Sequence, residues 1–187
     1  MTGSHEAKWR RLTALLEPFH EQAQATARRL SRSIADGDDL YQETLLRAFD
    51  RLPGLRDETR FRSWFYAILL NRHRSRSKEA FWRRFLPWNE AFPNGEEPAT
   101  FNDAGNREAG RAVEALAKLP DEQREAIVLF EMDGYSLEEV ARLTGASIPA
   151  VKSRLVRGRE RLRLHYERLS HSAAALQVSP RPGRERP

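Results

Sequence analysis

The stretch LEEVARLTGASIPAVKSRLV, residues 137–156, has the spacing of two helices joined by a tight turn. Ala141 is small at the point where the first helix must cross the second. Gly145 follows at the turn, where a positive φ carries no Cβ penalty. Val151 is placed to pack from the second helix against the first as a buried contact, and Ser147 is suited to cap the second helix. The register of these residues predicts a helix-turn-helix.

The outer face of the second helix is basic and suits insertion into the major groove of DNA. Lysine and arginine bind guanine edges, while serine and the first backbone amides of a helix hold phosphates. The face carries Ala150, Lys152, Ser153, Arg154 and Arg157. An ordinary helical hairpin with a charged exterior would explain the charges, but not the register of small residue, glycine and β-branched residue. We therefore favour DNA binding.

Helical periodicity dominates the rest of the chain, and no segment shows the alternation of period two that is typical of strands. Upstream of the helix-turn-helix, residues 107–118 and 121–132 each place apolar side chains on one helical stripe. With the segments 137–144 and 147–168, they predict a C-terminal unit of four helices.

An N-terminal bundle of about four helices is predicted by the same periodicity. Its apolar stripes run over residues 9–16, 19–30, 38–52 and 59–78. The third of these segments offers aspartates at its start as N-cap residues.

The predicted fold class is all-α, with two small helical domains joined by a flexible linker. The N-terminal bundle covers residues 5–84 and the C-terminal domain covers 107–169. Residues 85–106 collect proline, glycine and acidic side chains, which is typical of a linker. Residues 170–187 end in SPRPGRERP and are predicted to be a disordered tail.

The charge of the chain is unevenly distributed. Its 187 residues contain 32 Lys and Arg against 27 Asp and Glu, a formal net charge of +5. Basic residues gather in the segments 60–84 and 142–168, and the intervening segment 107–133 is acidic. Either block alone is explained by a solvated helix face. The two blocks together indicate two contacts with a polyanion.

Several classes of protein are disfavoured by what the sequence lacks. The chain has no cysteine, which excludes a disulfide scaffold, thiolate catalysis and Cys-ligated zinc. It has no glycine-rich phosphate loop and no H-E-x-x-H motif, so we expect no enzyme, no cofactor and no metal site. No run of about 18 apolar residues and no secretory signal occur. We therefore expect a cytoplasmic protein with no integral membrane segment.

The long N-terminal helix over 59–78 combines aromatic and basic side chains. Aromatic rings stack on unpaired bases, while flanking cations follow the phosphate backbone. The loop 54–60 that precedes this helix is placed to accept a flipped base. Some of the rings, Trp64 or Phe65, are needed for the core. The composition permits binding to single-stranded nucleic acid.

Two long stretches resemble a known family. DDLYQETLLRAFDRLPGLRDETRFRSWFYAILLNRHRSR, residues 38–76, resembles region two of bacterial sigma factors. LPDEQREAIVLFEMDGYSLEEVARLTGASIPAVKSRLVRGRERLR, residues 119–163, resembles region four. The order, the linker and the length match the extracytoplasmic-function (ECF) sigma factors. The resemblance covers roughly residues 10–80 and 107–168.

The resemblance implies a transcription initiation factor. Such proteins bind core RNA polymerase through its β′ clamp and β subunits, recognise promoter DNA and promote its melting, and an anti-sigma factor commonly holds them inactive. The helix DDLYQETLLRAF is similar to the family's docking surface for the β′ clamp helices. By this similarity, the polymerase-binding residues are Asp39, Gln42, Glu43 and Arg47.

The resemblance also assigns two DNA contacts. The residues implied for the minus-ten element are Leu55, Arg56, Phe61, Trp64, Asn71, Arg72 and Arg74. The family often has an aromatic residue where this chain has Leu55. The residues implied for the minus-thirty-five element are Ser147, Ala150, Lys152, Ser153, Arg154 and Arg157.

Two other readings remain open on the sequence. A conventional helix-turn-helix regulator would bind a palindromic operator by itself as a dimer, with the N-terminal bundle as a dimerisation or sensing module. An interaction adaptor would use its basic helices only for solubility. A sigma factor differs from both because it binds promoter DNA well only together with polymerase.

Overall fold

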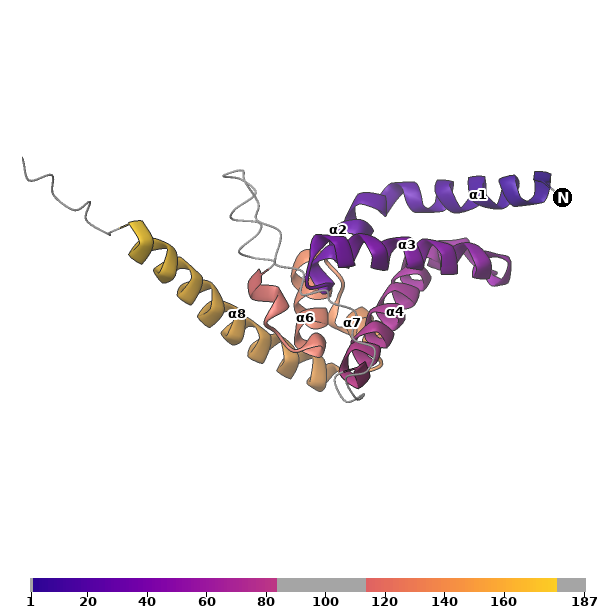
Figure 1. Cartoon of the computed structure of the whole chain (residues 1–187). Coiled ribbons are helices and arrows are strands. Elements are labelled where there is room, and N and C mark those ends of the chain that lie inside the picture. Colours follow the sequence, from indigo (N-terminus) through magenta and orange to yellow (C-terminus); the bar gives the residue numbers. More distant parts are fainter. Residues whose placement is uncertain (1, 84–113, 178–187) are drawn as a thin grey trace, which may run out of the picture.

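The computed structural model describes residues 2–83 and 114–177. Every regular element in these two ranges is helical, which confirms the all-α prediction (Figure 1). The predicted linker, residues 85–106, lies outside the described residues.

The N-terminal helices form one layered bundle. Helix α1 lies along α3, and α2 and α4 pack against the other sides of α3 (Figure 1). The elements in chain order are α1 (Thr2–Leu16), η1 (Glu17–Phe19), α2 (His20–Leu30), α3 (Ile34–Arg51), η2 (Leu52–Gly54), η3 (Glu58–Arg60) and α4 (Phe61–Arg83).

Helix α3 begins earlier than the sequence predicts, so the expected aspartate N-cap is wrong. The hydroxyl of Ser33 caps the helix by accepting a hydrogen bond from the amide of Asp36 at 3.1 Å. Gly37 then lets α3 approach α2 closely, because a Cβ there would lie 2.4 Å from the Cα of Arg28. Asp38, one residue further, accepts from Arg28 Nε at 2.7 Å. The aspartate therefore joins two helices instead of starting one.

The C-terminal helices contain the predicted helix-turn-helix. Residues 114–117 are helical. The elements that follow are α6 (Asp121–Ile127), a π-helical turn η4 (Val128–Met132), α7 (Leu137–Thr144) and α8 (Ile148–Gln177). Gly145 ends α7 with φ 65°, the left-handed conformation that the sequence predicted at this turn.

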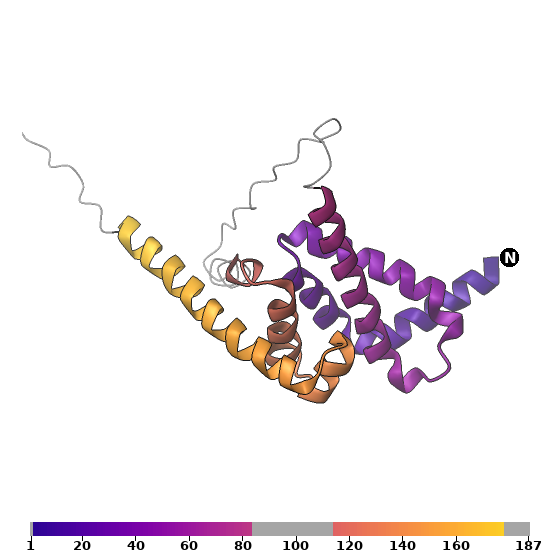
Figure 2. The same cartoon turned by 90° about the horizontal axis from the view of Figure 1, so that it is seen from below.

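Helix α8 is longer than expected, which corrects the boundary of the predicted disordered tail. The tail was expected from Ser170, but the helix continues to Gln177. The run of alanines at 173–175 explains the extension, since alanine has the highest helix propensity. Figure 2 shows the first half of α8 lying against α6 and α7, with its C-terminal half extending away from the other helices.

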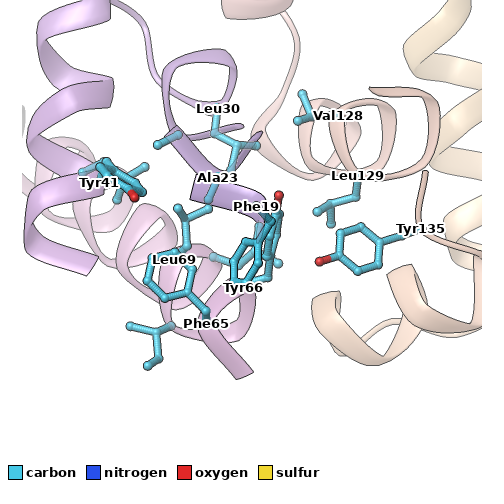
Figure 3. Close-up of a cluster of buried hydrophobic side chains, with 14 of the residues drawn as sticks. Phe19, Ala23, Leu30, Tyr41, Phe65, Tyr66, Leu69, Val128, Leu129 and Tyr135 are labelled. Atoms are coloured by element: carbon cyan, nitrogen blue, oxygen red, sulfur yellow. The ribbon is translucent and has the colours of Figure 1, made fainter. Parts of the chain in front are cut away.

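One buried cluster connects the N-terminal and C-terminal helices. Figure 3 shows Phe19, Phe65 and Tyr66 on one side and Leu129 and Tyr135 on the other. The rings of Tyr66 and Tyr135 meet edge to face, with their centroids 5.1 Å apart. The two halves of the chain therefore share apolar packing in this structure.

Candidate nucleic-acid and polymerase interfaces

The start of helix α8 presents a polar face to solvent. The Ser147 hydroxyl accepts from the amide of Ala150 at 3.3 Å, which fixes the first turn. Lys152 is exposed, and Arg157 donates through Nη2 to the Ser153 hydroxyl at 2.5 Å. The predicted residues thus lie along one side of the helix, with two cations accessible.

Arg154 is less accessible than the sequence suggested. Its side chain is 22% exposed and pairs with Glu122 of α6 at 2.8 Å. Together with Ala150 and Arg157, it lines a cavity of about 240 Å³ between α6 and α8. Arg154 must exchange this carboxylate for DNA if it is to bind a phosphate or a base.

Helix α7 is the support that positions α8. Ser136 and Glu139 form a reciprocal capping box: the Ser136 hydroxyl accepts from the Glu139 amide at 3.2 Å, and the Glu139 carboxylate accepts from the Ser136 amide at 2.8 Å. The backbone hydrogen bond from Ser136 lowers the pKa of Glu139. Val140 and Val151 are buried between the two helices. The recognition face is therefore held on a rigid hairpin.

Helix α4 carries a second group of predicted DNA contacts, and only part of it is free. Asn71 is exposed. Arg72 donates to Glu43 and, at 3.2 Å, to Glu79. Arg74 makes a bidentate pair with Glu125 of α6, at 2.6 Å for the closest contact. Both arginines are thus occupied by carboxylates in this structure.

The aromatic residues at the start of α4 divide into core and surface. Phe61 is only 2% exposed, and its ring centroid lies 5.9 Å from that of Phe19. It therefore faces the bundle core in this structure, and its contact with DNA stays a prediction. Trp64 is half-buried beside Phe61, with 5.6 Å between ring centroids, and keeps part of its surface exposed.

The loop before α4 is ordered by local hydrogen bonds. The Asp57 carboxylate accepts from the amide and the hydroxyl of Thr59 at 3.0 and 2.6 Å. The hydroxyl contact is the main cause that lowers the pKa of Asp57. Leu55 is half-buried against the core and Arg56 is exposed. Of these two predicted contacts, only Arg56 is exposed.

The outer face of α3 presents the residues predicted to bind polymerase. Asp39, Gln42 and Arg47 are exposed. Glu43 differs, because Arg72 and Arg76 of α4 bind its carboxylate, and the hydrogen bond from Arg72 is the main cause that lowers its pKa. Glu43 therefore joins α3 to α4 as well as facing this surface.

Sequence reasoning missed one residue of the α3 face. Leu46 is 58% exposed among the polar residues of this helix. It falls off the apolar stripe of Tyr41, Leu45 and Ala48, and a leucine outside the core stripe was the available signal. An exposed leucine surrounded by charges suits the centre of a protein interface.

Other kinds of site have no support within the two described ranges. No group of three or more His, Cys, Asp or Glu side chains there could hold a metal ion. No helix there is long and apolar enough to cross a bilayer.

Comparison with known proteins identifies the family. The family model described as Sigma-70 region 2 matches residues 15–82, and that of Sigma-70, region 4 matches residues 110–162. The chain is 34% identical over 149 residues to the ECF RNA polymerase sigma factor SigM of Mycobacterium tuberculosis, covering 79% of this chain and 73% of that protein. This chain belongs to the ECF sigma factors.

A further relative and two solved structures agree with this assignment. EcfG of Rhodopseudomonas palustris, also an ECF RNA polymerase sigma factor, is 33% identical over 137 residues, covering 71% of this chain and 72% of that protein. The sigma factor RpoE of Bartonella quintana, solved with the anti-sigma factor NepR, aligns with TM-score 0.65 and 26% identity over 81% of this chain and 94% of that one. CnrH, solved with the cytosolic domain of CnrY, aligns with TM-score 0.60 and 27% identity over 95% and 96% of the chains.

The assignment places each predicted surface in a family region. The α3 face and the loop and helix at 55–76 belong to the region 2 match, and the helix-turn-helix belongs to the region 4 match. The alternative reading as a conventional dimeric regulator is not favoured, because both regions occur in the sigma-factor order on one chain.

Proposed function

We propose that this ECF sigma factor docks on core RNA polymerase through the outer face of α3. The observation that carries the proposal is an exposed leucine, Leu46, surrounded by Asp39, Gln42 and Arg47 on one helix of region 2. An apolar centre with a charged rim gives both buried area and a register for the partner. Glu43 lies at the edge of the same face and supports it from α4.

We propose that the start of α4 and its preceding loop bind the single-stranded minus-ten element. Trp64 is half-buried and keeps part of its surface exposed, and Arg56 in the loop and Asn71 further along α4 are exposed. Extruding a base requires roughly a few kcal/mol, which stacking and hydrogen bonds to its edge offset. Arg72 and Arg74 supply phosphate contacts once their carboxylate partners release them. Half-buried Leu55 contributes to the same surface, and Phe61 supports it from the core.

We propose that α8 reads the minus-thirty-five element in the major groove. Lys152 and Arg157 are the accessible cations on its recognition face, and Ser153 lies between them, bonded to Arg157. Ser147 and the first amides of the helix suit a phosphate. Arg154 contributes after it leaves Glu122.

The relatives of known structure suggest a regulator as well. RpoE was solved with the anti-sigma factor NepR, and CnrH with the cytosolic domain of CnrY. By analogy, we propose that an anti-sigma factor controls this chain. Since its proposed partner polymerase transcribes in the cytoplasm, we place the protein there. The division into a region 2 domain over 5–84 and a region 4 domain over 107–169 belongs to the same proposal.

Run-off transcription with purified core RNA polymerase on a promoter library tests the function. We expect initiation at a defined set of sequences only when the chain is added, and loss of that activity in Leu46→Glu. Glu21→Gln, an exposed substitution on α2, is the matched surface control. Tight duplex binding by the free chain, with no co-elution with polymerase, would contradict the proposal and favour a conventional regulator.

A further inference from the structure

Regions 2 and 4 pack directly on each other in this chain. Helices α2 and α4 of region 2 contact η4, α6 and α7 of region 4 (Figures 1 and 3). The edge-to-face pair of Tyr66 and Tyr135 lies at this contact, and the Arg62 guanidinium stands 5.0 Å from the centre of the Tyr135 ring. The structure is therefore a closed arrangement of the two regions.

Asp133 of region 4 is inserted into region 2. Its side chain is fully buried, and one carboxylate oxygen lies 2.8 Å from the Thr26 hydroxyl. Arg29 approaches the other oxygen at 3.9 Å. The main-chain carbonyl of Asp133 accepts hydrogen bonds from Gln22 at 3.1 Å and from Arg62 at 3.3 Å. Two helices of region 2 thus hold one residue of region 4.

Two further polar contacts cross the same boundary. Arg124 of α6 donates through Nη1 to the main-chain carbonyl of Leu30 at 2.5 Å. Glu125, whose side chain is 1% exposed, binds the Arg74 guanidinium through both of its oxygens. The N–H fork of arginine that binds a carboxylate in this way is the same fork that binds a phosphate. Glu125 therefore occupies the atoms of Arg74 that would meet DNA.

The contact is imperfectly satisfied. His73 Nε2, Asp133 Oδ1 and the Tyr135 hydroxyl are buried, and none of them hydrogen-bonds to any of the described residues. A buried polar group without a hydrogen bond is costly, and it regains water when the contact opens. The closed arrangement is consequently less stable than its contact surface alone would suggest, which suits a reversible contact.

Promoter geometry requires the contact to open. The minus-ten and minus-thirty-five elements are named for positions roughly 25 base pairs apart, which at about 3.4 Å per base pair is roughly 85 Å of DNA. Two regions whose side chains touch cannot reach both elements at once. The closed arrangement and the promoter-bound arrangement exclude each other.

We propose that the contact of Asp133 with α2 and of Glu125 with Arg74 is autoinhibitory, with Glu125 standing in for a promoter phosphate. The inference rests on the proposed function, because it takes Arg74 as a DNA contact. When the binding-competent form is only a fraction of the population, the apparent affinity for every partner falls by that fraction. Core polymerase and promoter DNA therefore bind the open minority.

Energy transfer between two dyes measures the opening. The chain has no cysteine, so Ala14→Cys on α1 and Glu138→Cys on α7 can be labelled selectively; both positions are exposed. We expect one high-transfer population in the free full-length chain. Arg29→Glu sets a carboxylate against buried Asp133 and should lower the closed-to-open ratio at least about tenfold. Arg10→Glu, on the exposed surface of α1, is the matched charge reversal and should change nothing.

A second variant protects the test against misfolding. Arg62→Ala removes the side chain of α4 that donates to the Asp133 carbonyl, and it should lower the closed-to-open ratio as Arg29→Glu does. Far-UV circular dichroism confirms that each variant is folded. A broad low-transfer distribution in the parent chain would overturn the proposal. The proposal would also be overturned if the energy-transfer distributions of Arg29→Glu and Arg62→Ala were the same as that of Arg10→Glu.

Binding to core RNA polymerase tests whether closure inhibits. We expect Arg29→Glu to associate with core polymerase roughly tenfold faster than the parent, in proportion to its larger open fraction. Equal association rates in the presence of a clear opening would show that the contact is not inhibitory. Failure of every chain to bind polymerase would instead reject the proposed function, and the energy-transfer result would still report the contact itself.

Discussion

The basic helices of the two regions differ in what their cations touch. On α4 of region 2, Arg72 and Arg74 are each paired with carboxylates, from Glu43 and Glu79 and from Glu125. On α8 of region 4, Lys152 is exposed, and Arg157 donates to the neutral Ser153 hydroxyl. Similar composition thus produces two kinds of surface: one whose charge is already neutralised within the protein and one that is ready for an external anion.

The difference has a physical consequence for folding and binding. A cation paired with a partly buried carboxylate contributes to stability, and its removal leaves that carboxylate uncompensated. An exposed cation contributes almost nothing to folding and meets its partner only on DNA. Substitutions on α4 should therefore change stability, whereas equivalent substitutions on α8 should change binding alone.

The largest effect is expected from removing the two exposed cations of the α8 recognition face, Lys152 and Arg157. Lys152→Ala with Arg157→Ala should lower minus-thirty-five-dependent transcription by roughly a hundredfold, since each good base contact is worth about 1–3 kcal/mol. The free energy of unfolding should stay within about 0.5 kcal/mol of the parent. Run-off transcription and urea denaturation measure the two quantities. Full activity of the double variant would remove the distinction between the helices.

The next effect concerns α4. Arg72→Met should lower the free energy of unfolding by about 1 kcal/mol, because Glu43 loses one of its two arginine donors in a partly exposed pair. Lys152→Met on α8 is the matched control and should leave unfolding unchanged. Adding Glu43→Gln to Arg72→Met should recover part of the loss, since the carboxylate that is left with Arg76 as its one cationic partner is then gone. Urea denaturation of the four chains completes the comparison, and equal stability of the two single variants would refute it.

How well these surfaces can be predicted from the sequence depends on how far apart in the chain the interacting residues lie. The helix-turn-helix was predicted to its turn residue, because Gly145, Ser147 and the stripe residues act through neighbours in the chain. The pairing of Arg74 with Glu125 joins residues 51 positions apart and has no local signature. Phe61 was assigned to DNA by resemblance, although which ring of an aromatic cluster faces the core depends on how three helices meet.

Helix ends show the same limit. The start of α3 was misplaced because Ser33 offered as good a cap as the aspartates, and Gly37 was needed for a close crossing that only the folded bundle contains. The end of α8 was misplaced because the tail was judged by its proline-rich end, whereas the alanines before it continue the helix. Local propensity decided the second case and tertiary packing the first.

Two titratable groups of the closed contact, Asp133 and His73, have opposite effects on its pH dependence, and the first is Asp133. Burial raises the pKa of Asp133 from 3.8 to about 6. The Thr26 hydroxyl lies 2.8 Å from both the Gln22 carbonyl and Asp133, and it has one proton to donate, so a protonated Asp133 satisfies the site better. Because the pKa of Asp133 is higher in the closed state than its ordinary value, protonation of Asp133 stabilises the closed contact. This stabilisation is full below pH 3.8 and is lost as the pH rises through 6. The charged and titratable groups facing Asp133 are Arg29, Arg62, Tyr66 and Tyr135.

The second group is His73. Burial lowers the pKa of His73 from 6.5 to about 4, with Asp121 and Arg124 of region 4 and Arg74 and Arg32 of region 2 around it. Because the pKa of His73 is lower in the closed state, the closed contact favours the neutral imidazole. The stabilisation from neutral His73 is full above pH 6.5 and is lost as the pH falls toward 4. The two groups therefore oppose each other between pH 7.5 and 5.5.

Separating the two groups gives a moderate effect of predictable sign. In His73→Gln, the closed-to-open ratio should rise about fourfold as the pH falls from 7.5 to 5.5, because Asp133, with its pKa of about 6, still titrates in this range while the opposing histidine is gone. In Asp133→Asn, the ratio should fall by up to about tenfold over the same range. The energy-transfer pair on residues 14 and 138 reads both directly. If the closed-to-open ratio changed with pH in the same direction in both variants, one of the two groups would not be buried by closure.

The smallest effect should come from the one predicted recognition residue of α8 that resembles the α4 arginines. Arg154 is held by Glu122, but Glu122 is 70% exposed, so the pair is worth at most about 1 kcal/mol and is screened by salt. Glu122→Gln should free Arg154 and raise holoenzyme affinity for minus-thirty-five duplex about twofold at low salt, with a smaller gain at high salt. Glu131→Gln, which removes the exposed partner of Arg159 on the same region, controls for the loss of one negative charge. Because both variants reduce the charge equally, a gain confined to Glu122→Gln locates the effect at Arg154, whereas equal gains would mean that net charge alone steers the DNA.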